Sequence, residues 1–533
     1  MRILSISPWH DASVCVLSEA GLECYFKEER LSRTKHDSYP YFAIARACEE
    51  AQGKITDIIT AAPCEDPIEA LMAKYAQKLL GAGDSYCSYS HRHHLQHAWL
   101  AYHNSGFSHC AVIVVDRIGS SHPRSHSKSE TESVYEFRSL SQHRPIIKRY
   151  RDHAVKISHS DRYSITRVYE AAGEAIGVGV LESGKVMGLS AYGRSDRVTQ
   201  PLFLENNTVN AALFAETESE ICRFRNRTRT EHVGPEDYHY HADLALSVQL
   251  ATQQQLAALV SEAHKQTGAQ QFCITGGYAL NIVANSFLLE QFPQFEFWFE
   301  PMADDTGNSI GAALGHYAAV TGKVPEPILN NGLFFHGVKH HAPTEADCSV
   351  DAAQIAAYLQ TNKSVGVYEG LSEAGQRALG HRSILHSAFD PQAKAVVNRI
   401  KNREWYRPFA CAVLEEDITS IAHSVNSKHT AYMTNSFRIK QAAADRLSGV
   451  VHADGTARLQ SVKRDSTLGR ILAEIKKQTG LGVVLNTSMN LAGEPLVETP
   501  QQAIDLYSSS SLGLLWFADT GAAFRKAGDS NCV

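Results

Sequence analysis

The sequence has little of what several classes of protein require. No apolar stretch approaches the roughly 20 residues that span a bilayer. The 11 cysteines are scattered, odd in number and never spaced Cys-x-x-Cys, and the net charge is −6. These absences argue against a membrane protein, a disulfide framework, a zinc–thiolate site and a main partner that is nucleic acid. The N-terminal residues also lack the apolar core of a signal peptide, so we expect a cytoplasmic protein.

The composition is that of a soluble globular protein with more than one domain. Hydrophobic residues make up 44% and charged residues 20% of 533 residues, a length that suggests about two to four domains. Residues 323–343 contain three prolines and no helical period. Because such a stretch favours a linker, we place the domain boundary there and expect domains at residues 1–335 and 345–533.

The hydrophobic pattern predicts an α/β fold. Residues 3–7, 12–17 and 22–26 read as strands of an N-terminal hairpin, and residues 110–116 as a buried strand. Helical spacing marks residues 42–51, 67–80 and 244–265, whereas the Ser- and His-rich residues 117–132 read as a mobile loop. The hairpin and the later strand before Gly276 are candidates for the two halves of a duplicated actin-like fold.

Four polar blocks in the C-terminal part predict a polyanion site. They begin at residues 377, 400, 452 and 485, and they gather cations and hydrogen-bonding side chains around short apolar strands. Arg forks and a Lys point charge suit phosphate oxygens, and amide and hydroxyl groups can fix a planar group beside them. Surface ion pairs are the alternative for any single Arg. The residues are Arg377, Arg382, Lys401, Arg403, Arg407 and Arg458, with Asn486, Ser488 and Asn490.

A histidine-rich segment in the first part is a candidate metal site. His93 and His97 are four residues apart in a helical stretch, so both rings fall on one face. Asp116 ends a buried strand and Asp305 precedes a glycine, so both can supply oxygen ligands. The alternative is a segment that is simply rich in histidine, since His91 and His94 are neighbours.

Two further motifs carry weaker signals. His10 follows the first strand and is the candidate general base there; the alternative is a histidine that bonds Asp11 to shape a turn. The Gly276–Gly277 pair either lets the backbone approach a phosphate or makes a tight turn. The charges of residues 27–37 either line a solvated edge or contact a ligand.

Several long motifs, in order, resemble one family. R-A-L-G-H-R-S-I-L, K-N-R-E-W-Y-R-P-F-A, H-A-D-G-T-A-R-L-Q and N-T-S-M-N-L-A-G-E-P-L-V-E-T-P look like C-terminal signatures of the NodU/CmcH/TobZ-type O-carbamoyltransferases. In the N-terminal half, H-H-L-Q-H-A, V-V-D and D-T-G-N-S-I-G-A-A resemble that family's metal motifs. One departure is that Leu491 and Ala492 stand where many relatives are basic, and Lys463 or Arg464 could supply the phosphate contact.

The resemblance implies a fold and a set of ligands. It implies an N-terminal actin-like (ASKHA, Kae1-like) duplicated α/β domain followed by a C-terminal YrdC-like α/β domain. Carried over by position, the metal ligands are His93, His97, Asp116 and Asp305, with Asp304 competing for the last place. The family ion is iron-like, although two nitrogens and two oxygens also suit Mn, Co or Zn.

The resemblance also implies a reaction. ATP, with Mg²⁺, and carbamoyl phosphate would form carbamoyl-adenylate in the second domain, where Lys401 and Arg458 are the candidate catalytic cations and the other seven polar residues of the four blocks are ligands. The first domain would pass the carbamoyl group to the hydroxyl of a small-molecule acceptor activated by His10. Gly276, Gly277 and Asn281 are the candidate cofactor contacts there. We expect neither a nucleic-acid nor a membrane partner, and the sequence leaves open whether the protein forms a homodimer.

Three other functions remain open from sequence. A threonylcarbamoyl-adenylate enzyme that modifies tRNA would use the same two domain types but needs a basic face, which the acidic balance disfavours. An actin-like sugar phosphotransferase would leave the C-terminal cations unexplained. A non-catalytic nucleotide or metal sensor is the third. Sugars, antibiotics of several classes, an alkaloid toxin and an oligosaccharide all remain candidates for the acceptor and its pathway.

Overall fold

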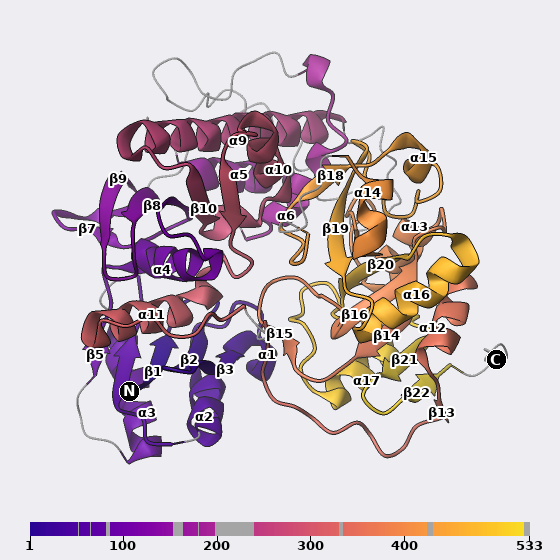
Figure 1. Cartoon of the computed structure of the whole chain (residues 1–533), viewed down its shortest axis with the longest axis horizontal. Helices are drawn as coiled ribbons and strands as arrows, with labels where there is room; N and C mark the ends of the chain where they lie inside the picture. Colours follow the sequence, from indigo (N-terminus) through magenta and orange to yellow (C-terminus); the bar gives the residue numbers. More distant parts are fainter. Residues whose placement is uncertain are drawn as a thin grey trace. The chain divides into compact units, whose positions relative to one another are not determined.

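The structure, a computed structural model, divides the chain into two compact units (Figure 1). The first unit comprises Met1–Trp9, Cys15–Glu23 and Ala51–Pro327, and the second comprises His10–Val14, Cys24–Glu50 and Ile328–Val533. The domain ranges 1–335 and 345–533 stay a prediction. The residues described are 1–51, 53–63, 66–81, 86–152, 164–179, 181–197, 239–329, 334–423 and 430–526.

The first unit is built around two sheets. One has the strand order β3-β2-β1-β4-β5, and the other has the order β11-β10-β6-β8-β7, with β9 paired to β8. The strands of the first sheet are β1 (Arg2–Ser7), β2 (Ser13–Ser18), β3 (Gly21–Lys27), β4 (Asp57–Thr60) and β5 (Cys87–Ser88). Those of the second are β6 (Cys110–Val115), β7 (Ser121–His122), β8 (Ser125–Phe137), β9 (His143–Asp152), β10 (Gln271–Thr275) and β11 (Glu296–Phe299).

The two sheets repeat one strand order. With the short edge strand β7 left aside, the second sheet has the order β9-β8-β6-β10-β11. In chain order these are the third, second, first, fourth and fifth strands, the same order as β3-β2-β1-β4-β5 in the first sheet. In both sheets the first and fourth strands are parallel, and so are the fourth and fifth. This repetition confirms the expected duplicated, actin-like α/β domain, which alternation along single segments could only suggest.

Two helices lie between these sheets and carry most of the metal-site candidates. Helix α4 (His93–Ser105) packs on β6 and β10, whereas α11 (Asn308–Thr321) packs on β1 and β4 and against α4. A Cβ added at Gly311 would overlap the carbonyl oxygen of Gln96, and one at Gly315 would overlap the ring of Trp99. Glycine at these positions therefore sets how closely the two helices approach.

The remaining helices of the first unit cover outer faces. Helix α9 packs against β6, α5, α6 and α10, and α3 packs against β4 (Figure 1). Their bounds are α3 (Pro67–Leu80), α5 (Ile165–Ile176), α6 (Ser183–Ser190), α9 (His239–Thr267) and α10 (Ile282–Gln291). Short 3₁₀ turns lie at η2 (Ser195–Arg197), η4 (Gly277–Leu280) and η5 (Asp305–Gly307). The helices predicted at 67–80 and 244–265 are confirmed.

The second unit contains a nine-stranded mixed sheet in the order β13-β22-β21-β14-β16-β20-β17-β19-β18. Apolar side chains alternate between its faces: Leu385 and Val484 pack with α12 and α16, whereas Ile384 and Leu485 pack with α13 and α17. A sheet covered by helices on both faces is the α/β architecture expected of a YrdC-like domain.

These elements have the following bounds. The strands are β13 (Cys348–Ser349), β14 (Val365–Tyr368), β16 (Arg382–Ser387), β17 (Ala410–Leu414), β18 (Ser436–Arg438), β19 (Thr456–Val462), β20 (Val483–Ser488), β21 (Leu514–Phe517) and β22 (Ala522–Arg525), with β12 (Phe335–His336) and β15 (Ser372–Glu373) forming a separate pair. The helices are α1 (Glu28–Ser32), α2 (Tyr41–Glu50), α12 (Ala352–Gln360), α13 (Ala393–Ile400), α14 (Ile418–Ile421), α15 (Gln441–Ala444), α16 (Thr467–Thr479) and α17 (Pro500–Ser509), with η7 at Glu415–Asp417.

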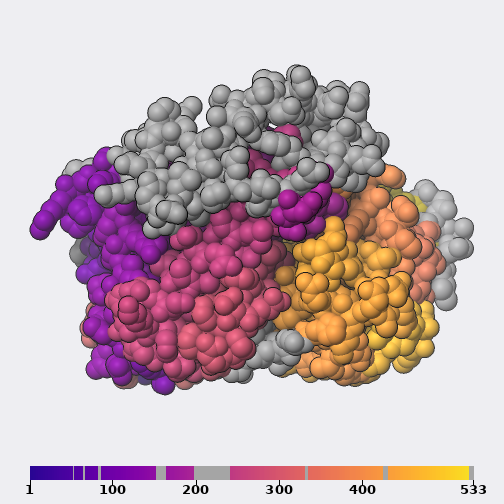
Figure 2. All heavy atoms as spheres, turned by 90° about the horizontal axis from the view of Figure 1, so that it is seen from above, coloured from indigo at the N-terminus to yellow at the C-terminus, as the bar shows by residue number. Residues whose placement is uncertain are grey.

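The prediction of a mobile loop at residues 117–132 is wrong. The segment contains β7 and much of β8, which pairs antiparallel with both β6 and β9. Residues 129–133 of β8 are buried and polar, so no apolar alternation marks this part of the strand. The turn between β7 and β8 projects from the body of the first unit (Figures 1 and 2). Among the described residues no helix is long and apolar enough to cross a membrane.

Candidate active site and metal centre

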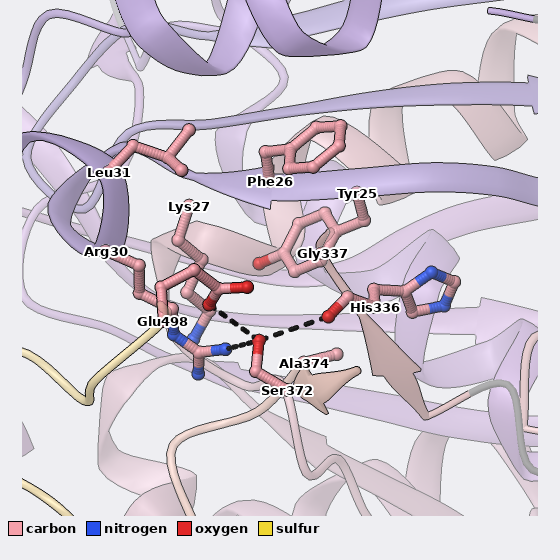
Figure 3. A pocket seen from close by; sticks show the side chains of 10 residues that line it. All are labelled: Tyr25, Phe26, Lys27, Arg30, Leu31, His336, Gly337, Ser372, Ala374 and Glu498. Carbon is pink, nitrogen blue, oxygen red and sulfur yellow. Dashed lines mark hydrogen bonds between the residues drawn. The ribbon is translucent and has the colours of Figure 1, made fainter. Parts of the chain in front are cut away.

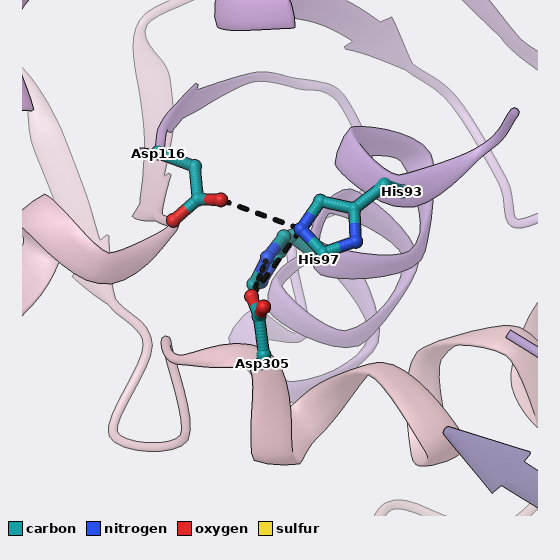
Figure 4. Close-up of side chains that lie close together, drawn as sticks. All are labelled: His93, His97, Asp116 and Asp305. Carbon is teal, nitrogen blue, oxygen red and sulfur yellow. Dashed lines mark hydrogen bonds and ion pairs between the residues drawn. The ribbon is translucent and has the colours of Figure 1, made fainter. Parts of the chain in front are cut away.

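The four predicted metal ligands come together in the first unit. His93 and His97 extend from α4, Asp116 follows β6, and Asp305 opens η5 (Figure 4). His93 Nε2 lies 3.3 Å from Asp116 Oδ2 and 3.2 Å from Asp305 Oδ1, and His97 Nε2 lies 3.2 Å from Asp305 Oδ1. One ligand atom from each residue lies within 4.8 Å of the others. This convergence fits a single ion bound by two nitrogens and two oxygens.

The electrostatics of this cluster also suit a cation. All four side chains are buried. Burial lowers the pKa of His93, but the charges of Asp305 and Asp116 and their hydrogen bonds raise it more, so its net pKa is raised. Burial and Asp305 raise the pKa of Asp116, yet the two histidines outweigh them and its pKa is lowered. The carboxylates thus draw a proton onto the imidazole, where a divalent ion would compete with it.

Groups of neighbouring residues hold Asp116 in place. The amide of Gly277 donates to Asp116 Oδ1 at 3.0 Å, and the hydroxyl of Thr166 donates to the carbonyl of Asp116 at 2.8 Å. Gly276 has φ +84°, and a Cβ there would lie 2.5 Å from the carbonyl oxygen of Val115. The glycine pair therefore allows a close approach that orients a candidate metal ligand, as outer-shell groups do.

The other candidates near this site have structural partners. Asn281 caps α10, since its side-chain oxygen accepts from the amides of Val283 and Ala284. Its role as a cofactor contact, like those of Gly276 and Gly277, stays a prediction. Asp304, the competitor for the last metal position, accepts a hydrogen bond from the Thr306 hydroxyl at 2.5 Å. Asp305, rather than Asp304, belongs to the converging group.

The four C-terminal blocks meet on one line across the sheet of the second unit. Ala410 of β17 is in register with Arg458 of β19 on one side and with Asn486 of β20 on the other. Asn486 in turn is in register with Leu385 of β16. One segment of each block is therefore a neighbour of the next, although about a hundred residues separate Leu385 from Asn486 in sequence. Strand pairing thus brings one segment of each block to the same line of the sheet.

Lys401 is buried within a ring of oxygens. Its ammonium donates to the carbonyl of Ser488, to the Ser488 hydroxyl at 3.3 Å, and to the carbonyl and side-chain oxygens of Asn490 at 2.8 and 2.9 Å. Burial and the charges of Arg403 and Arg407 hold its pKa well below the ordinary value. Three predicted ligands, Lys401, Ser488 and Asn490, thus form one hydrogen-bonded group.

The arginines near it repel one another. Burial lowers the pKa of Arg458 most, and the charges of Arg377, Arg403 and Arg407 lower it further. Arg403 donates to Asn398 Oδ1 at 2.7 Å and to the carbonyl of Pro408 at 3.2 Å. The Arg458 Nε atom has no hydrogen-bond partner among the described residues. An anion placed among these guanidinium groups would relieve their repulsion.

Two other predicted ligands are engaged mainly with protein. Arg382 is fully buried; its guanidinium donates to the carbonyls of Glu369 and Gly370 at 2.6 and 2.9 Å and lies 3.6 Å from the ring centre of Tyr368. Asn486 donates to Gln460 Oε1 at 2.7 Å. Their roles as phosphate or nucleotide ligands stay predictions. Arg464, proposed to compensate for Leu491 and Ala492, pairs with exposed Glu416.

His10 belongs to a hydrogen-bonded chain of three residues in the second unit. Its Nδ1 lies 3.0 Å from Asp11 Oδ2, and Nδ1 of His36 lies 2.7 Å from Asp11 Oδ1. Asp11 and His36 have φ values of 61° and 59°, a left-handed conformation that non-glycine residues rarely adopt. If His10 donates to Asp11 through Nδ1, the basic lone pair of the neutral ring lies on Nε2. The bond to Asp11 is the one expected of a turn-shaping histidine, and neither interpretation of His10 includes His36.

A small pocket in the second unit also escaped the sequence analysis. Arg30 donates to the Ser372 hydroxyl at 3.0 Å, and that hydroxyl donates to Glu498 Oε2 at 2.7 Å (Figure 3). Lys27 and Arg30 are buried, and both donate to the carbonyl of Gly375. For these two cations the solvated edge considered from sequence is therefore wrong, and only long-range contacts could have revealed it.

Comparison with known proteins identifies the family. Residues 67–314 match the family described as Carbamoyltransferase N-terminus, and residues 356–522 match the family described as Carbamoyltransferase C-terminus. The chain belongs to the carbamoyltransferase family. The matched ranges contain the four converging metal-ligand candidates and all cations of the four blocks, whereas His10 precedes both ranges.

Relatives of this carbamoyltransferase include nodulation proteins. Nodulation protein NolNO of Sinorhizobium fredii is 26% identical over 94% of this chain and 77% of its own length. Nodulation protein U of Rhizobium tropici is 38% identical, over 44% of this chain and 41% of its own length. Full-length HypF in the phosphate- and nucleotide-bound form is 13% identical, with a TM-score of 0.41, over 62% of this chain and 56% of that chain. The repeated strand order, not this last similarity, supports the fold assignment.

Proposed function

We propose that this carbamoyltransferase is an ATP-dependent O-carbamoyltransferase that acts on a small-molecule hydroxyl. Water would cleave carbamoyl phosphate to carbamate and phosphate, and a carbamate oxygen would attack the α-phosphate of ATP and release pyrophosphate. The acceptor oxygen would then attack the carbamoyl carbon as AMP leaves. One water, carbamoyl phosphate, ATP and the alcohol thus give a carbamate ester, AMP, pyrophosphate and phosphate.

The cation cluster of the second unit is the observation that carries this proposal. Arg458 is opposed by the charges of three other arginines, and Lys401 by two of them. Repulsion of this kind costs stability unless an anion accompanies it, and two phosphate-bearing substrates supply several negative charges. Preorganised cations of this kind stabilise the charge that develops during phosphoryl and adenylyl transfer.

The residues around Lys401 can divide the work of adenylate formation. The guanidinium groups of Arg403, Arg407 and Arg458 would bind phosphate oxygens. Lys401 holds Ser488 and Asn490 in place through four oxygen contacts. Hydroxyl and amide groups fixed in this way can hold the planar carbamoyl group by its oxygen and nitrogen.

Transfer to the acceptor would use a bound metal and a general base. His93, His97, Asp116 and Asp305 would hold a divalent transition metal, which supplies Lewis-acid charge toward substrate oxygens when bound. His10, oriented by Asp11, would take the hydroxyl proton on Nε2. Gly277 fixes Asp116 through its amide, so this ligand is oriented before substrate arrives.

The reaction can be tested in two stages. The whole chain is incubated with ATP and carbamoyl phosphate, and pyrophosphate release and exchange of labelled pyrophosphate into ATP are measured without an acceptor. Both should depend on carbamoyl phosphate. Hydroxyl compounds, including sugars and antibiotics, are then added and analysed by mass spectrometry for a carbamoyl adduct. Absence of carbamoyl-phosphate-dependent exchange would remove the adenylate from the mechanism.

A further inference from the structure

Asn308 lies at the metal cluster although it is not one of the four predicted ligands. It is the first residue of α11, three residues after Asp305, and is fully buried. Its side-chain Nδ2 lies 3.3 Å from His97 Nε2, 3.4 Å from Asp305 Oδ1 and 3.4 Å from His93 Nδ1. One terminal atom of Asn308 therefore faces the side chains of three of the four candidate ligands.

These distances match the spacing of atoms that share an ion. Two ligand atoms about 2.1 Å from a metal are about 3.0–3.4 Å apart when they subtend angles of about 90–109° at it. The ligand atoms of His93, His97 and Asp305 show separations of 3.2 Å in this structure. The 3.3 and 3.4 Å separations of the Asn308 terminal atom from His97 and Asp305 belong to the same range.

The orientation of the carboxamide would have to change when a cation binds. The amide nitrogen faces the cluster, whereas Asn308 Oδ1 is buried with no hydrogen-bond partner among the described residues. A cation among His97, Asp305 and this nitrogen would face a donor group and repel it. Because the nitrogen and oxygen of a carboxamide have nearly the same shape, a half-turn about the last side-chain bond exchanges them. The half-turn replaces the repelled nitrogen with an oxygen that lacked a partner.

We infer that Asn308 is a fifth protein ligand of the metal, through its carboxamide oxygen. The inference rests on the metal centre of the proposed function. A centre with two nitrogens and three oxygens exceeds the four-coordinate preference of structural zinc and suits an ion that accepts five or six ligands, such as Fe, Mn or Co. Asn308 lies within the D-T-G-N-S-I-G-A-A segment, but it is neither a histidine nor a carboxylate, so the sequence patterns do not single it out.

Cobalt(II) binding to the metal-free whole chain tests the inference without any activity measurement. Asn308→Leu removes the donor and keeps the volume. It should weaken Co²⁺ binding at least about tenfold. It should also strengthen the visible absorption of the cobalt, because four-coordinate Co²⁺ absorbs more strongly than five- or six-coordinate Co²⁺. Asn285→Leu is the control: Asn285 is equally buried and donates to the carbonyl of Ala279, outside the cluster.

Other outcomes overturn the inference. A folded Asn308→Leu variant with wild-type affinity and spectrum would exclude ligation, and weaker binding with an unchanged spectrum would reduce Asn308 to an orienting role. Asn308→Asp keeps an oxygen donor, so it should keep the wild-type spectrum; loss of metal in this variant would contradict us. Should Asn308→Leu not fold, a crystal structure of the wild type with Co²⁺ decides, since an Oδ1–cobalt distance beyond about 3 Å excludes a bond. If the wild type binds no Co²⁺, the metal centre itself fails.

Discussion

Individual charged side chains of the second unit are held in two different ways. Lys401 donates to four oxygens of Ser488 and Asn490, so its ammonium group is hydrogen-bonded within the fold although Arg403 and Arg407 repel it. Arg458 is opposed by three other arginines, and its Nε has no partner among the described residues. A buried cation that is hydrogen-bonded to the protein holds its neighbours in place, whereas one with an atom left unbonded adds repulsion that a bound anion can relieve.

This difference separates two alanine variants. Arg458→Ala and Lys401→Ala should both abolish ATP consumption that depends on carbamoyl phosphate. Only Lys401→Ala should also lower stability, by about 1–3 kcal/mol, because it strands oxygens that the ammonium satisfied. Arg458→Ala should keep its melting temperature or raise it. Isotopic exchange and thermal unfolding measure the two effects, and folded variants that form the adenylate at the normal rate would place these residues outside the site.

A second residue-scale prediction concerns His10. His10→Asn should slow carbamoyl transfer to an acceptor by about 10²–10⁴-fold, because general-base catalysis contributes about that much. Pyrophosphate release without an acceptor should survive. The wild-type rate should fall on the acid side as the imidazole is protonated, and the variant should lose that limb. A histidine that merely shapes the turn would instead lower both half-reactions together, along with the melting temperature.

A third prediction follows from the pair of His36 and Asp11. The hydrogen bond to Asp11 raises the pKa of His36 although burial lowers it. The charge of Glu29 raises this pKa further, and the charge of Lys35 lowers it. A raised histidine pKa gives stability that is complete below the ordinary value of about 6.5 and is lost as pH rises through the folded value. His36→Asn, which tolerates the left-handed backbone, should therefore destabilise more at about pH 6 than at about pH 9. Urea unfolding at both pH values measures this, and equal losses would contradict the pairing.

At the scale of elements, the contact of α4 with α11 sets the geometry of the metal cluster. Gly311→Ala should destabilise by about 1–3 kcal/mol, because the methyl group would overlap the carbonyl oxygen of Gln96 and push the helices apart. Asp305 would then move relative to His97, so metal content should fall as well. Gly184→Ala in α6 is the control, since a Cβ there meets nothing within 4 Å. It should be neutral or stabilising by up to about 1 kcal/mol. Equal losses in both variants would reject helix spacing as the cause.

The sequence predicted elements best where apolar periodicity was strong. Strand β6 is buried at every position and α9 is long, and both were expected. Strand β8 was missed because its pairing to β6 and β9 buries polar residues, which alternation of apolar residues cannot reveal. The four metal-ligand candidates were found through helical spacing and motif resemblance. His36, Asn308 and the Arg30–Ser372 contact were not found, because each depends on pairing across the fold.

At the scale of the whole molecule, the metal should couple distant parts of the first unit. Its candidate ligands are supplied by α4, the end of β6 and η5, which span more than 200 residues of sequence. The purified protein should contain about one equivalent of a transition metal, and free metal at about 100 times Kd should add about 2.7 kcal/mol of stability. Chelation should lower the melting temperature, and His97→Ala should lose both the metal and this response. Active protein without metal, shown by elemental analysis, would contradict the assignment.

The membership of residues 24–50 in the second unit has a consequence for the order of synthesis. These residues leave the ribosome more than 300 residues before the partners of Arg30 and Arg33, which are Ser372, Gly375 and the carbonyls of residues 495–496. At about 5–20 residues per second, α1 waits roughly 20–90 s for those partners. A nascent chain that stalls before residue 372 therefore cannot complete its second unit.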